Sequence, residues 1–578
     1  MISREEIKQD LEQLKQIVIQ HKAPDAPLST SAKVIDGIEQ EVFNKIPETL
    51  HDVYRLALEA PERDFLVYQK ERFSFGQTYK LACSLAKIMM GRFGVGKGDR
   101  VAICSRNNPE WCIAYMATTI IGAVAVPMNS WWTGAELSYG LEDSGSNLLF
   151  ADQERITRIS PYLDPLNLDI IAIKPDADSN FPELHQLLLE DNNYRDIDLT
   201  TLEIAADDNA TIMYTSGSTG HPKGVLSTHR NITHALYSWL FAKEINEILR
   251  PELFEENPEF EPSILANVPL FHVTGSHAQF LASFINQRKF VMMYKWDAEI
   301  ALSLIEQEHI TVLHGVPTMT WEMMQSPNFD STDMSSVRYV QAGGAARPPE
   351  HLTIMLEKFP AKAIPGLGYG LTETNALGAI ISGKFYEYIP HSTGRPIVPV
   401  TRIKIVDKND NSLGTEEVGE ICIKGPTVMK EYWNRPQETQ SALKDGWFYS
   451  GDIGKLDDLG FLIILDRAKD IVIRGGENIG CAEVEYAIVE HPAVNEVSVY
   501  GIPDNRLGEI LCASVMLKTG ETLDSENLKQ FLINKLAQFK IPQHISFQFE
   551  QLPRIASGKI AKKQLRELAI THYSQLAG

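Results

Sequence analysis

The sequence predicts an α/β protein with a large layered N-terminal domain and a small α+β C-terminal lid domain. The chain has 578 residues, which is too many for a single hydrophobic core. Helical and strand-like runs alternate between about residues 47 and 465, separated by glycine-containing turns. Residues 466–578 carry two amphipathic helical patterns, over residues 483–489 and 527–539, with strand-like runs between them.

Residues 1–46 are expected to form an N-terminal helical extension. An amphipathic run opens this segment, and a proline-containing connector, Ala23–Pro27, follows it. The pattern assigns no role to the extension.

The domain predicted over residues 47–465 opens with a regular alternation of elements. We expect helices over residues 77–92 and 111–121 and strands over residues 101–104 and 123–127. The most apolar stretch, residues 111–128, is interrupted by two threonines and a proline, which favours a buried helix running into a strand over a membrane span.

A P-loop-like glycine spacing occurs at Gly91–Lys97. Gly98 stands where a magnesium-binding Ser or Thr would be required, and the run leads from a helix to a strand, whereas a P-loop leads from a strand to a helix. We therefore expect an ordinary turn over residues 94–99.

The densest functional pattern is Thr215–Gly224, which contains three glycines, four hydroxyl side chains and Lys223. A strand-like run, Ala210–Tyr214, precedes it. Glycines let backbone N–H groups converge on an anion, hydroxyl groups add donors, and a lysine adds a mobile positive charge. The pattern predicts a phosphate-binding loop, and its spacing fits neither a P-loop nor a nucleophile elbow.

This loop resembles the signature of the adenylate-forming enzymes, which include acyl-CoA synthetases, firefly-type luciferases and peptide-synthetase adenylation domains. Further motifs follow in the order of that family: Tyr369–Thr374, Ser392–Pro396, Tyr449–Asp452, Asp466–Asp470, Arg474–Ile479 and Pro553–Lys559. The resemblance covers about residues 50–570. It identifies the chain as a member of this superfamily, most like a fatty acyl-CoA ligase.

Charge and cysteine content narrow the class of partners. The formal net charge is −22, which argues against nucleic acid, because duplex binding needs a positive surface. Six scattered cysteines without a paired spacing favour reduced thiols over a zinc site or a disulfide framework. Together with the polar first residues, they predict a cytoplasmic protein.

The resemblance implies two reactions at one site. ATP converts a carboxylic acid into acyl-AMP with release of pyrophosphate, and the thiol of coenzyme A then displaces AMP. The first step needs positioning and charge more than a side-chain nucleophile. The implied cofactors and substrates are Mg²⁺, ATP and coenzyme A.

The resemblance also implies the nucleotide site. The signature loop would hold the β- and γ-phosphates, Tyr369 would stack on adenine, and Asp452 with Arg467 would hold the ribose. The expected ATP- and AMP-binding residues are Thr215, Ser216, Gly217, Ser218, Thr219, Gly220, Lys223, Gly344, Ala345, Ala346, Gly368, Tyr369, Asp452 and Arg467.

Four residues are expected to act on the reacting groups. Lys559 would bridge the substrate carboxylate and the α-phosphate, and Thr372 would contact the α-phosphate. Glu373 would bind magnesium together with Thr215. His272 matches a family position beside the acyl carboxylate, with a core histidine as the alternative. His277 and His314 have no comparable support for a catalytic role, and for them we expect core or surface positions. The acyl pocket is expected to involve residues 272–276, 314–318, 343–345 and 366–370.

A change of conformation is implied between the two reactions. The resemblance places the hinge at Lys469 and assigns the coenzyme A tunnel to Gly475, Gly476, Glu477 and Asn478. The following Gly480-Cys481-Ala482 departs from the aromatic residue and proline common at this point, which leaves the detail of the tunnel open.

The sequence thus predicts an acid–thiol ligase acting on a small-molecule carboxylic acid. Small residues at Gly315, Gly343–Ala346 and Gly366–Gly370 favour a medium- or long-chain fatty acid. An aromatic acid of the 4-coumarate type stays open, and so does transfer to a carrier protein. No transmembrane segment is expected, whereas peripheral membrane contact and a homodimer are compatible with the sequence.

Overall fold

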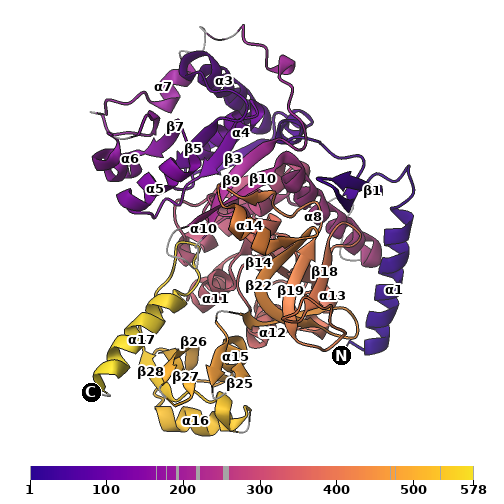
Figure 1. The fold of residues 1–578 in the computed structure, drawn as a ribbon, viewed down its shortest axis with the longest axis vertical. Coiled ribbons are helices and arrows are strands. Elements are labelled where there is room, and N and C mark those ends of the chain that lie inside the picture. The colour runs from indigo at the N-terminus through magenta and orange to yellow at the C-terminus, as the bar shows by residue number, and fades with distance from the viewer. Residues whose placement is uncertain are drawn as a thin grey trace.

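Two large sheets form the body of the protein, and a smaller sheet at the C-terminus forms a separate unit (Figure 1). The structure is a computed structural model that describes residues 2–164, 166–177, 179–189, 194, 196–215, 222–251, 259–468, 470–474, 477–504, 506–533 and 535–576. The elements named below are those of the described residues. The α/β fold class expected from the sequence is confirmed.

The first large sheet has the strand order β20-β10-β9-β6-β5-β7-β8. Its strands are β5 (Arg100–Cys104), β6 (Val124–Pro127), β7 (Leu148–Asp152), β8 (Asp169–Ile173), β9 (Asn209–Thr215), β10 (Lys223–Thr228) and β20 (Glu431–Tyr432). Its helices include α4 (Pro109–Ile120), α5 (Gly134–Ser144), α6 (Gln153–Ile159) and α7 (Leu184–Leu189). The expected strands over residues 101–104 and 123–127 therefore correspond to β5 and β6.

The second large sheet has the order β17-β16-β15-β14-β13-β11-β12-β3-β4. Its strands are β3 (Asp64–Tyr68), β4 (Glu71–Ser74), β11 (Ser263–Ala266), β12 (Lys289–Met292), β13 (Val312–Gly315), β14 (Tyr339–Gly343), β15 (Ile364–Tyr369), β16 (Ala379–Ser382) and β17 (Arg395–Pro396). The strands from β3 through β12, β11, β13 and β14 to β15 are parallel, so their carboxyl ends share one edge. Ligands of open parallel sheets bind at that edge.

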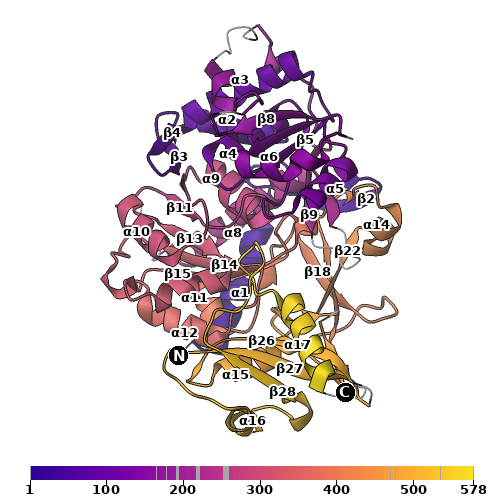
Figure 2. The same ribbon diagram turned by 90° about the vertical axis from the view of Figure 1, so that its left-hand side faces the viewer.

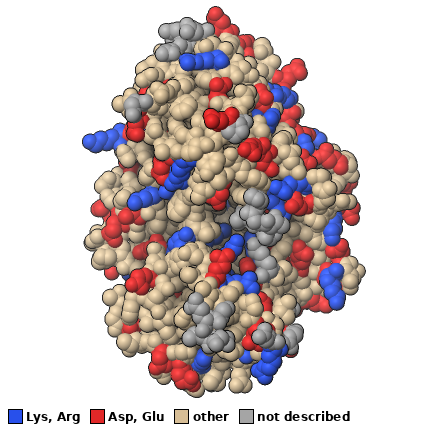
Figure 3. Space-filling model, turned by 60° about the vertical axis from the view of Figure 1, so that its left-hand side comes forward, with Lys and Arg blue, Asp and Glu red and all other residues tan. Residues whose placement is uncertain are grey.

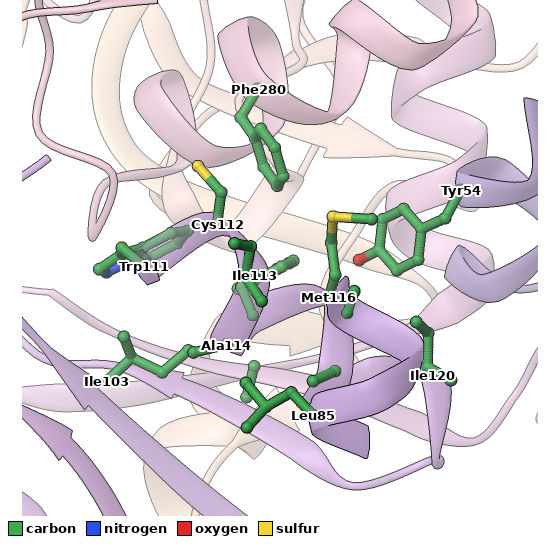
Figure 4. Close-up of a cluster of buried hydrophobic side chains, with 14 of the residues drawn as sticks. Tyr54, Leu85, Ile103, Trp111, Cys112, Ile113, Ala114, Met116, Ile120 and Phe280 are labelled. Atoms are coloured by element: carbon green, nitrogen blue, oxygen red, sulfur yellow. The ribbon is translucent and has the colours of Figure 1, made fainter. Parts of the chain in front are cut away.

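Helices cover both large sheets and fill the space between them. They include α2 (Leu50–Arg55), α3 (Phe75–Phe93), α8 (His229–Leu249), α9 (Ala282–Ile285), α10 (Ala298–Glu308), α11 (Pro317–Gln325), α12 (Pro349–Lys358) and α13 (Gly383–Tyr388), with a π-helical segment over Thr274–Leu281 before α9. Figure 4 shows the centre of this core, where Trp111 and Met116 of α4 lie with Leu85 of α3, Tyr54 of α2 and Phe280. The stretch over residues 111–128 is thus a buried helix and strand, as expected. None of the described helices combines the length and the apolarity that crossing a bilayer needs.

A third sheet carries the chain toward the C-terminal unit. It contains β18 (Arg402–Val406), β19 (Gly419–Lys424), β21 (Leu443–Lys444), β22 (Trp447–Leu456) and β23 (Leu462–Arg467), with α14 (Pro436–Ala442) beside it. The next strand, β24, belongs to a different sheet. The chain therefore passes from the body to the C-terminal unit between Arg467 and Val472.

The C-terminal unit has its own sheet and hydrophobic cluster. Its elements are β24 (Val472–Arg474), β25 (Glu477–Ile479), α15 (Cys481–Val489), β26 (Val494–Asp504), β27 (Gly508–Leu517), α16 (Ser525–Ile533), β28 (His544–Gln548) and α17 (Lys562–Leu576). The helix expected over residues 527–539 ends earlier, at Ile533, and residues 538–540 form a separate 3₁₀ turn. Nη1 of Arg474 donates a hydrogen bond to the carbonyl of Phe539 in this turn at 2.6 Å. The nearby Pro542 also disfavours continuation of the helix.

The N-terminal segment is a helix followed by a hairpin, so the expectation of a helical extension was wrong for its second half. Helix α1 (Arg4–Gln20) is followed by β1 (Thr30–Ile35) and β2 (Ile38–Phe43), which pair around Asp36 and Gly37. Both turn residues have positive φ, as a tight hairpin requires. Helix α1 lies along the outside of the body (Figure 1) and contacts α8.

Candidate active site

A cavity of about 1900 Å³ lies at the carboxyl edge of the parallel strands and extends to the C-terminal unit. Of the expected site residues whose side chains the structure describes, all except Lys223 and Glu477 line it. These lining residues are Thr215, His272, Gly344, Ala345, Ala346, Gly368, Tyr369, Thr372, Glu373, Asp452, Arg467 and Lys559. Motifs that are up to several hundred residues apart thus meet at one cavity.

One wall of the cavity is a hydrogen-bonded group formed by Tyr369, Asp452 and Arg467. The hydroxyl of Tyr369, at the end of β15, donates to Oδ2 of Asp452 at 2.7 Å. Arg467 Nε lies 3.0 Å from Oδ1 of the same carboxylate. Asp452 and Arg467 are register partners on β22 and β23, so the sheet itself holds this pair together. Asp452 is only 4% exposed.

A second group is built around Glu373, in the 3₁₀ turn Thr372–Thr374 that follows β15. Its Oε1 accepts a hydrogen bond from the hydroxyl of Tyr432 at 2.8 Å. Burial raises the pKa of Glu373, while the hydroxyl of Tyr432 and the charge of Arg467 act in the opposite direction. The ammonium of Lys223 lies 5.1 Å from the centre of the Tyr432 ring. Lys223 therefore contacts this group through the Tyr432 ring and does not itself line the cavity.

The signature loop connects two paired strands. Thr215 at the end of β9 is the register partner of Lys223 at the start of β10. The strand expected before the loop is therefore present as β9, and the chain returns beside it. The expected phosphate contacts of Ser216, Gly217, Ser218, Thr219 and Gly220 lie outside the described residues.

Lys559 reaches the cavity from the C-terminal unit. The loop that carries it, between β28 and α17, extends into the body toward β14 (Figure 2). A Cβ atom on Gly344 would lie 3.3 Å from Lys559 Nζ, so the ammonium rests against the backbone at the end of β14. The carbonyl of Gly558 accepts a hydrogen bond from the hydroxyl of Thr318 at 3.2 Å, which fixes the loop on α11.

The ammonium of Lys559 has no carboxylate partner within the described part of the chain. Burial lowers the pKa of Lys559 to about 8, and the charge of Arg467 acts in the same direction. A buried and unpaired cation favours an anion beside it. Lys559 is therefore placed to attract a carboxylate or a phosphate that enters the cavity.

His272 lies between the end of β11 and the π-helical segment, and its half-buried side chain lines the cavity. Burial lowers the pKa of His272 to about 3, and Lys559 contributes in the same direction. Nε2 of His272 is buried without a hydrogen-bond partner among the described residues. The ring is therefore neutral at pH 7 and has one nitrogen available to a ligand.

His277 and His314, for which no catalytic role is expected, occupy different positions in the structure. His277 is fully buried, as expected for a core residue. His314, at β13, lines the cavity, as expected for residues 314–318 of the acyl pocket and not as expected for a core or surface histidine. Its register partner is Gln341, two residues before Gly343.

Of the residues expected to contact coenzyme A, Glu477 does not line the cavity. Glu477 is exposed and pairs with Arg474 across the β24–β25 hairpin. The backbone of Asn478 pairs with Ile473. Gly475, Gly476 and the expected hinge residue Lys469 lie outside the described residues.

The donor set suits magnesium bound jointly with phosphate. Among the described residues no three metal-ligating side chains of His, Cys, Asp or Glu gather at one point. Magnesium needs only one or two carboxylates when substrate phosphates supply further oxygen ligands. Glu373 offers such a carboxylate, and Thr215 lines the same cavity with a hydroxyl.

Comparisons with known proteins agree with this geometry. The family described as "AMP-binding enzyme" matches residues 54–433, and "AMP-binding enzyme C-terminal domain" matches residues 483–559. The long-chain-fatty-acid–CoA ligase FadD13 of Mycobacterium tuberculosis is 34% identical over 86% of this chain and 93% of its own length. A feruloyl-CoA synthase of Amycolatopsis is 33% identical over 82% of this chain and 89% of its own length.

A solved structure extends the likeness to the fold. The o-succinylbenzoate CoA synthetase of Bacillus subtilis, in complex with its acyl-adenylate intermediate, superposes with a TM-score of 0.73. It is 30% identical, and the match covers 89% of this chain and 97% of that one.

Proposed function

Because the chain belongs to the family of AMP-binding enzymes and its relatives are AMP-forming acid–CoA ligases, we propose that it activates an extended carboxylic acid and transfers the acyl group to coenzyme A. Enzymes of this family use ATP and coenzyme A together with Mg²⁺. The observation that carries the proposal is the position of Lys559 against Gly344, in the cavity that Asp452 and Glu373 also line.

In the proposed adenylation step, the carboxylate of the acid attacks the α-phosphorus of ATP and pyrophosphate leaves. Two anions must approach each other, so the barrier is lowered by fixed positive charge and by orientation. Lys559 supplies the charge between carboxylate and α-phosphate, and Thr372 donates to the α-phosphate. Asp452 accepts from the ribose hydroxyls, with Arg467 holding its carboxylate.

Magnesium, held by Glu373 and Thr215, would neutralise charge on the phosphates. The signature loop, Ser216–Gly220 with Lys223, would hold the β- and γ-phosphates, and Gly344–Ala346 with Gly368 and Tyr369 would bind the adenine side. The neutral ring of His272 would position the acid carboxylate, which its buried and unpartnered Nε2 supports.

The thioester step requires a second arrangement of the C-terminal unit. In the arrangement described here Lys559 occupies the cavity, and the residues 475–478 assigned to coenzyme A include Glu477, which is outside it. A rotation about Lys469 would withdraw Lys559 and bring that loop to the acyl group. Coenzyme A is the proposed acceptor because the relatives are CoA ligases.

The acid is proposed to be a medium- or long-chain fatty acid. Support comes from the branch of the cavity that passes His272 and Gly343 and continues between α8 and β14, as far as Tyr339. Gly315, however, does not line the cavity, because a Cβ there would meet Asn267 and Met319. The absence of a side chain at Gly315 therefore serves packing and not the volume of the pocket.

A panel of acids tests the proposal through release of pyrophosphate and of AMP, each measured with and without coenzyme A. We expect kcat/KM to rise from acetate to longer acids, because each buried methylene contributes up to about 0.8 kcal/mol. A series that is flat with chain length, or a preference for cinnamate-like acids, would refute the fatty-acid assignment. AMP release that does not depend on coenzyme A would point to another acceptor.

We further propose that the protein is located in the cytoplasm. All six cysteines are free thiols in the structure, which suits a reducing compartment. Acidic and basic side chains are interspersed over the face shown in Figure 3, so that face offers no large basic patch for nucleic acid.

A further inference from the structure

The part of the cavity at the amino ends of β12 and β14 carries positive charge, which an apolar chain does not need. Glu247 also lines the cavity, and its carboxylate is paired with Lys243 at 3.5 Å. Arg288 and Arg338 line the cavity at the amino ends of β12 and β14, opposite to the nucleotide edge. This occurs in a chain with a formal net charge of −22. Positive side chains inside a cavity of an acidic protein call for a specific explanation.

Arg288 is the basic residue there whose side chain has neither an ion pair nor a hydrogen bond among the described residues. No described carboxylate lies within ion-pair distance of its guanidinium, and its Nε is buried without a hydrogen-bond partner. Burial lowers the pKa of Arg288 to about 10, so it stays charged at pH 7. Arg338 differs, because its Nη1 donates to the carbonyl of Ser335 at 2.6 Å.

The position of the Arg288 guanidinium along the cavity is given by the side chains near it and by the strand register. Its charge contributes to the lowered pKa of His314 and opposes the raised pKa of Tyr339, so the guanidinium lies near both side chains. His314 is level with Gln341, two residues before Gly343, and Tyr339 is four residues before it. The strand register places Phe290 level with Tyr339, and therefore the backbone of Arg288 level with Val337, six residues before Gly343. At a strand rise of about 3.3 Å per residue the backbone of Arg288 lies roughly 20 Å from Gly343, and a side chain extended toward Tyr339 brings the guanidinium to roughly 13 Å.

We propose that Arg288 binds a second carboxylate at the far end of the substrate, which makes an extended dicarboxylic acid the preferred acid. This inference rests on the proposed function, because it concerns the acyl side of the same site. The reacting carboxylate would lie near Lys559 and His272, and the distal one would meet the guanidinium, whose planar donors match a carboxylate in bidentate geometry.

A monocarboxylic acid with an apolar tail would leave the charge of Arg288 without a counterion. An apolar chain that reached this depth would exclude water from the guanidinium without offering an acceptor, and an unpaired buried charge is costly. A monocarboxylic acid therefore gains from added methylene groups only until its tail reaches Arg288. A diacid of matching length gains the ion pair in addition.

The experiment compares acids in pairs of equal length by pyrophosphate release from ATP, without coenzyme A. Each pair is a straight-chain α,ω-diacid and its monoacid, from roughly C6 to C12, to span the distance above. The ω-monoamide of the best diacid serves as a neutral analogue of the same shape. For the wild-type protein we expect kcat/KM of the best diacid to exceed that of its monoacid and monoamide by about 10-fold or more.

Arg288→Met should remove this preference, lowering kcat/KM for the diacid on the order of 10- to 100-fold and leaving the monoacid unchanged or improved. Arg288→Lys should keep part of the preference, because it keeps the charge but not the bidentate donors. Arg63→Met is the matched control. Arg63 also has a buried Nε without a partner, lies 3.8 Å from Glu261 and does not line the cavity, so its ratio of diacid to monoacid should equal that of the wild type.

Equal kcat/KM for diacid and monoacid in the wild type would overturn the inference, and so would an equal loss for both acids in Arg288→Met. The wild-type comparison with the monoamide decides the matter even if Arg288→Met does not fold. A different result separates the two proposals: if no acid of either kind releases pyrophosphate from ATP, the ligase function itself fails.

Discussion

Lys559 shows how one residue can be held ready for a reaction by its surroundings. Its ammonium rests against the backbone of Gly344, and no carboxylate neutralises it in the part of the chain that the structure describes. A side chain on Gly344, which has φ of +77°, would both strain the backbone and displace Lys559. The glycine and the lysine are thus one functional unit, although 215 residues separate them in the numbering.

Replacing Lys559 should separate the two half-reactions. Lys559→Ala is expected to lower acyl-AMP formation on the order of 10²-fold or more, comparable to the loss of one preorganised electrostatic donor. Thioester formation from supplied acyl-AMP should be largely retained, because Lys559 is proposed to leave the cavity for that step. Single-turnover measurements of each half-reaction check this, and equal losses in both would contradict the assignment.

The charge of Lys559 should also be visible in the pH dependence of adenylation. Lys559 is protonated below its pKa of about 8 and neutral above it. The value of kcat/KM for ATP reports the free enzyme, so it should be highest below pH 8 and decline as the pH rises through this value. In Lys559→Arg the decline should disappear from the accessible range, since a guanidinium stays charged. A decline that persists unchanged in this variant would assign it to another group.

Site residues that belong to sequence motifs could be predicted from the sequence. Residues that reach the cavity only because of the way distant strands pair could not. Thr372, Glu373, Asp452 and Lys559 lie in recognisable patterns and meet at one cavity. The exposure of Arg288 to that cavity depends on how β12, β11 and β13 pair with one another. No spacing along the chain encodes this.

Among the elements, α11 holds the C-terminal loop in the position seen here. Oε1 of Glu322 accepts from Arg554 Nη2 at 3.0 Å and from the side-chain amide of Gln551. Arg554 also lies 2.7 Å from Glu496 of β26. The indole Nε1 of Trp321 donates to Asn495 at 3.1 Å. These contacts join the body to the C-terminal unit in the arrangement that places Lys559 in the cavity.

Weakening this contact should affect one half-reaction more than the other. Glu322→Gln removes the charge facing Arg554 and should slow acyl-AMP formation by roughly 5- to 30-fold, the effect of losing one charged hydrogen bond. Thioester formation from supplied acyl-AMP should change by less than about 2-fold. Glu299→Gln is the control, because Glu299 of α10 bonds only to Ser326 and Asn328 among the described residues. A uniform loss in both half-reactions would indicate a general loss of stability.

At the scale of elements, the sequence predicted helices and strands with long periodic patterns more accurately than short elements. Helix α3 and strand β5 lie within two residues of their expected bounds. The β1–β2 hairpin was not anticipated, although Asp36-Gly37 between two strand-like runs is a known hairpin signal.

At the scale of the whole molecule, two units line one cavity, and the proposed thioester step requires a change in their relative position. The structure describes the arrangement with Lys559 inside the cavity. Lys469→Pro should restrict the backbone at the proposed hinge. We expect acyl-AMP formation to stay within about 3-fold of the wild type, and thioester formation to fall on the order of 10-fold or more.

The two half-reactions, assayed separately for Lys469→Pro, provide the check. Lys408→Pro, in a turn between β18 and β19 of the same body, serves as a control for the introduction of proline. If thioester formation survives in Lys469→Pro, the pivot lies elsewhere in the chain.

The N-terminal helix has a consequence for the order in which the protein matures. Asp10 of α1 bonds to Lys384 at 3.0 Å, although the two are 374 positions apart in the chain, and Arg4 pairs with Asp458. At a synthesis rate of roughly 5–20 residues per second, Asp10 waits about 20–75 s for its partner to leave the ribosome. A helix of 17 residues is only marginally stable alone. The second half of α1 can pack earlier, because Ile17 and Val18 share a cluster with Phe241 of α8. The first half, whose Ile7 and Leu11 share a cluster with Tyr386, is therefore among the last parts to dock, and chaperones have time to bind it before α13 exists to cover it.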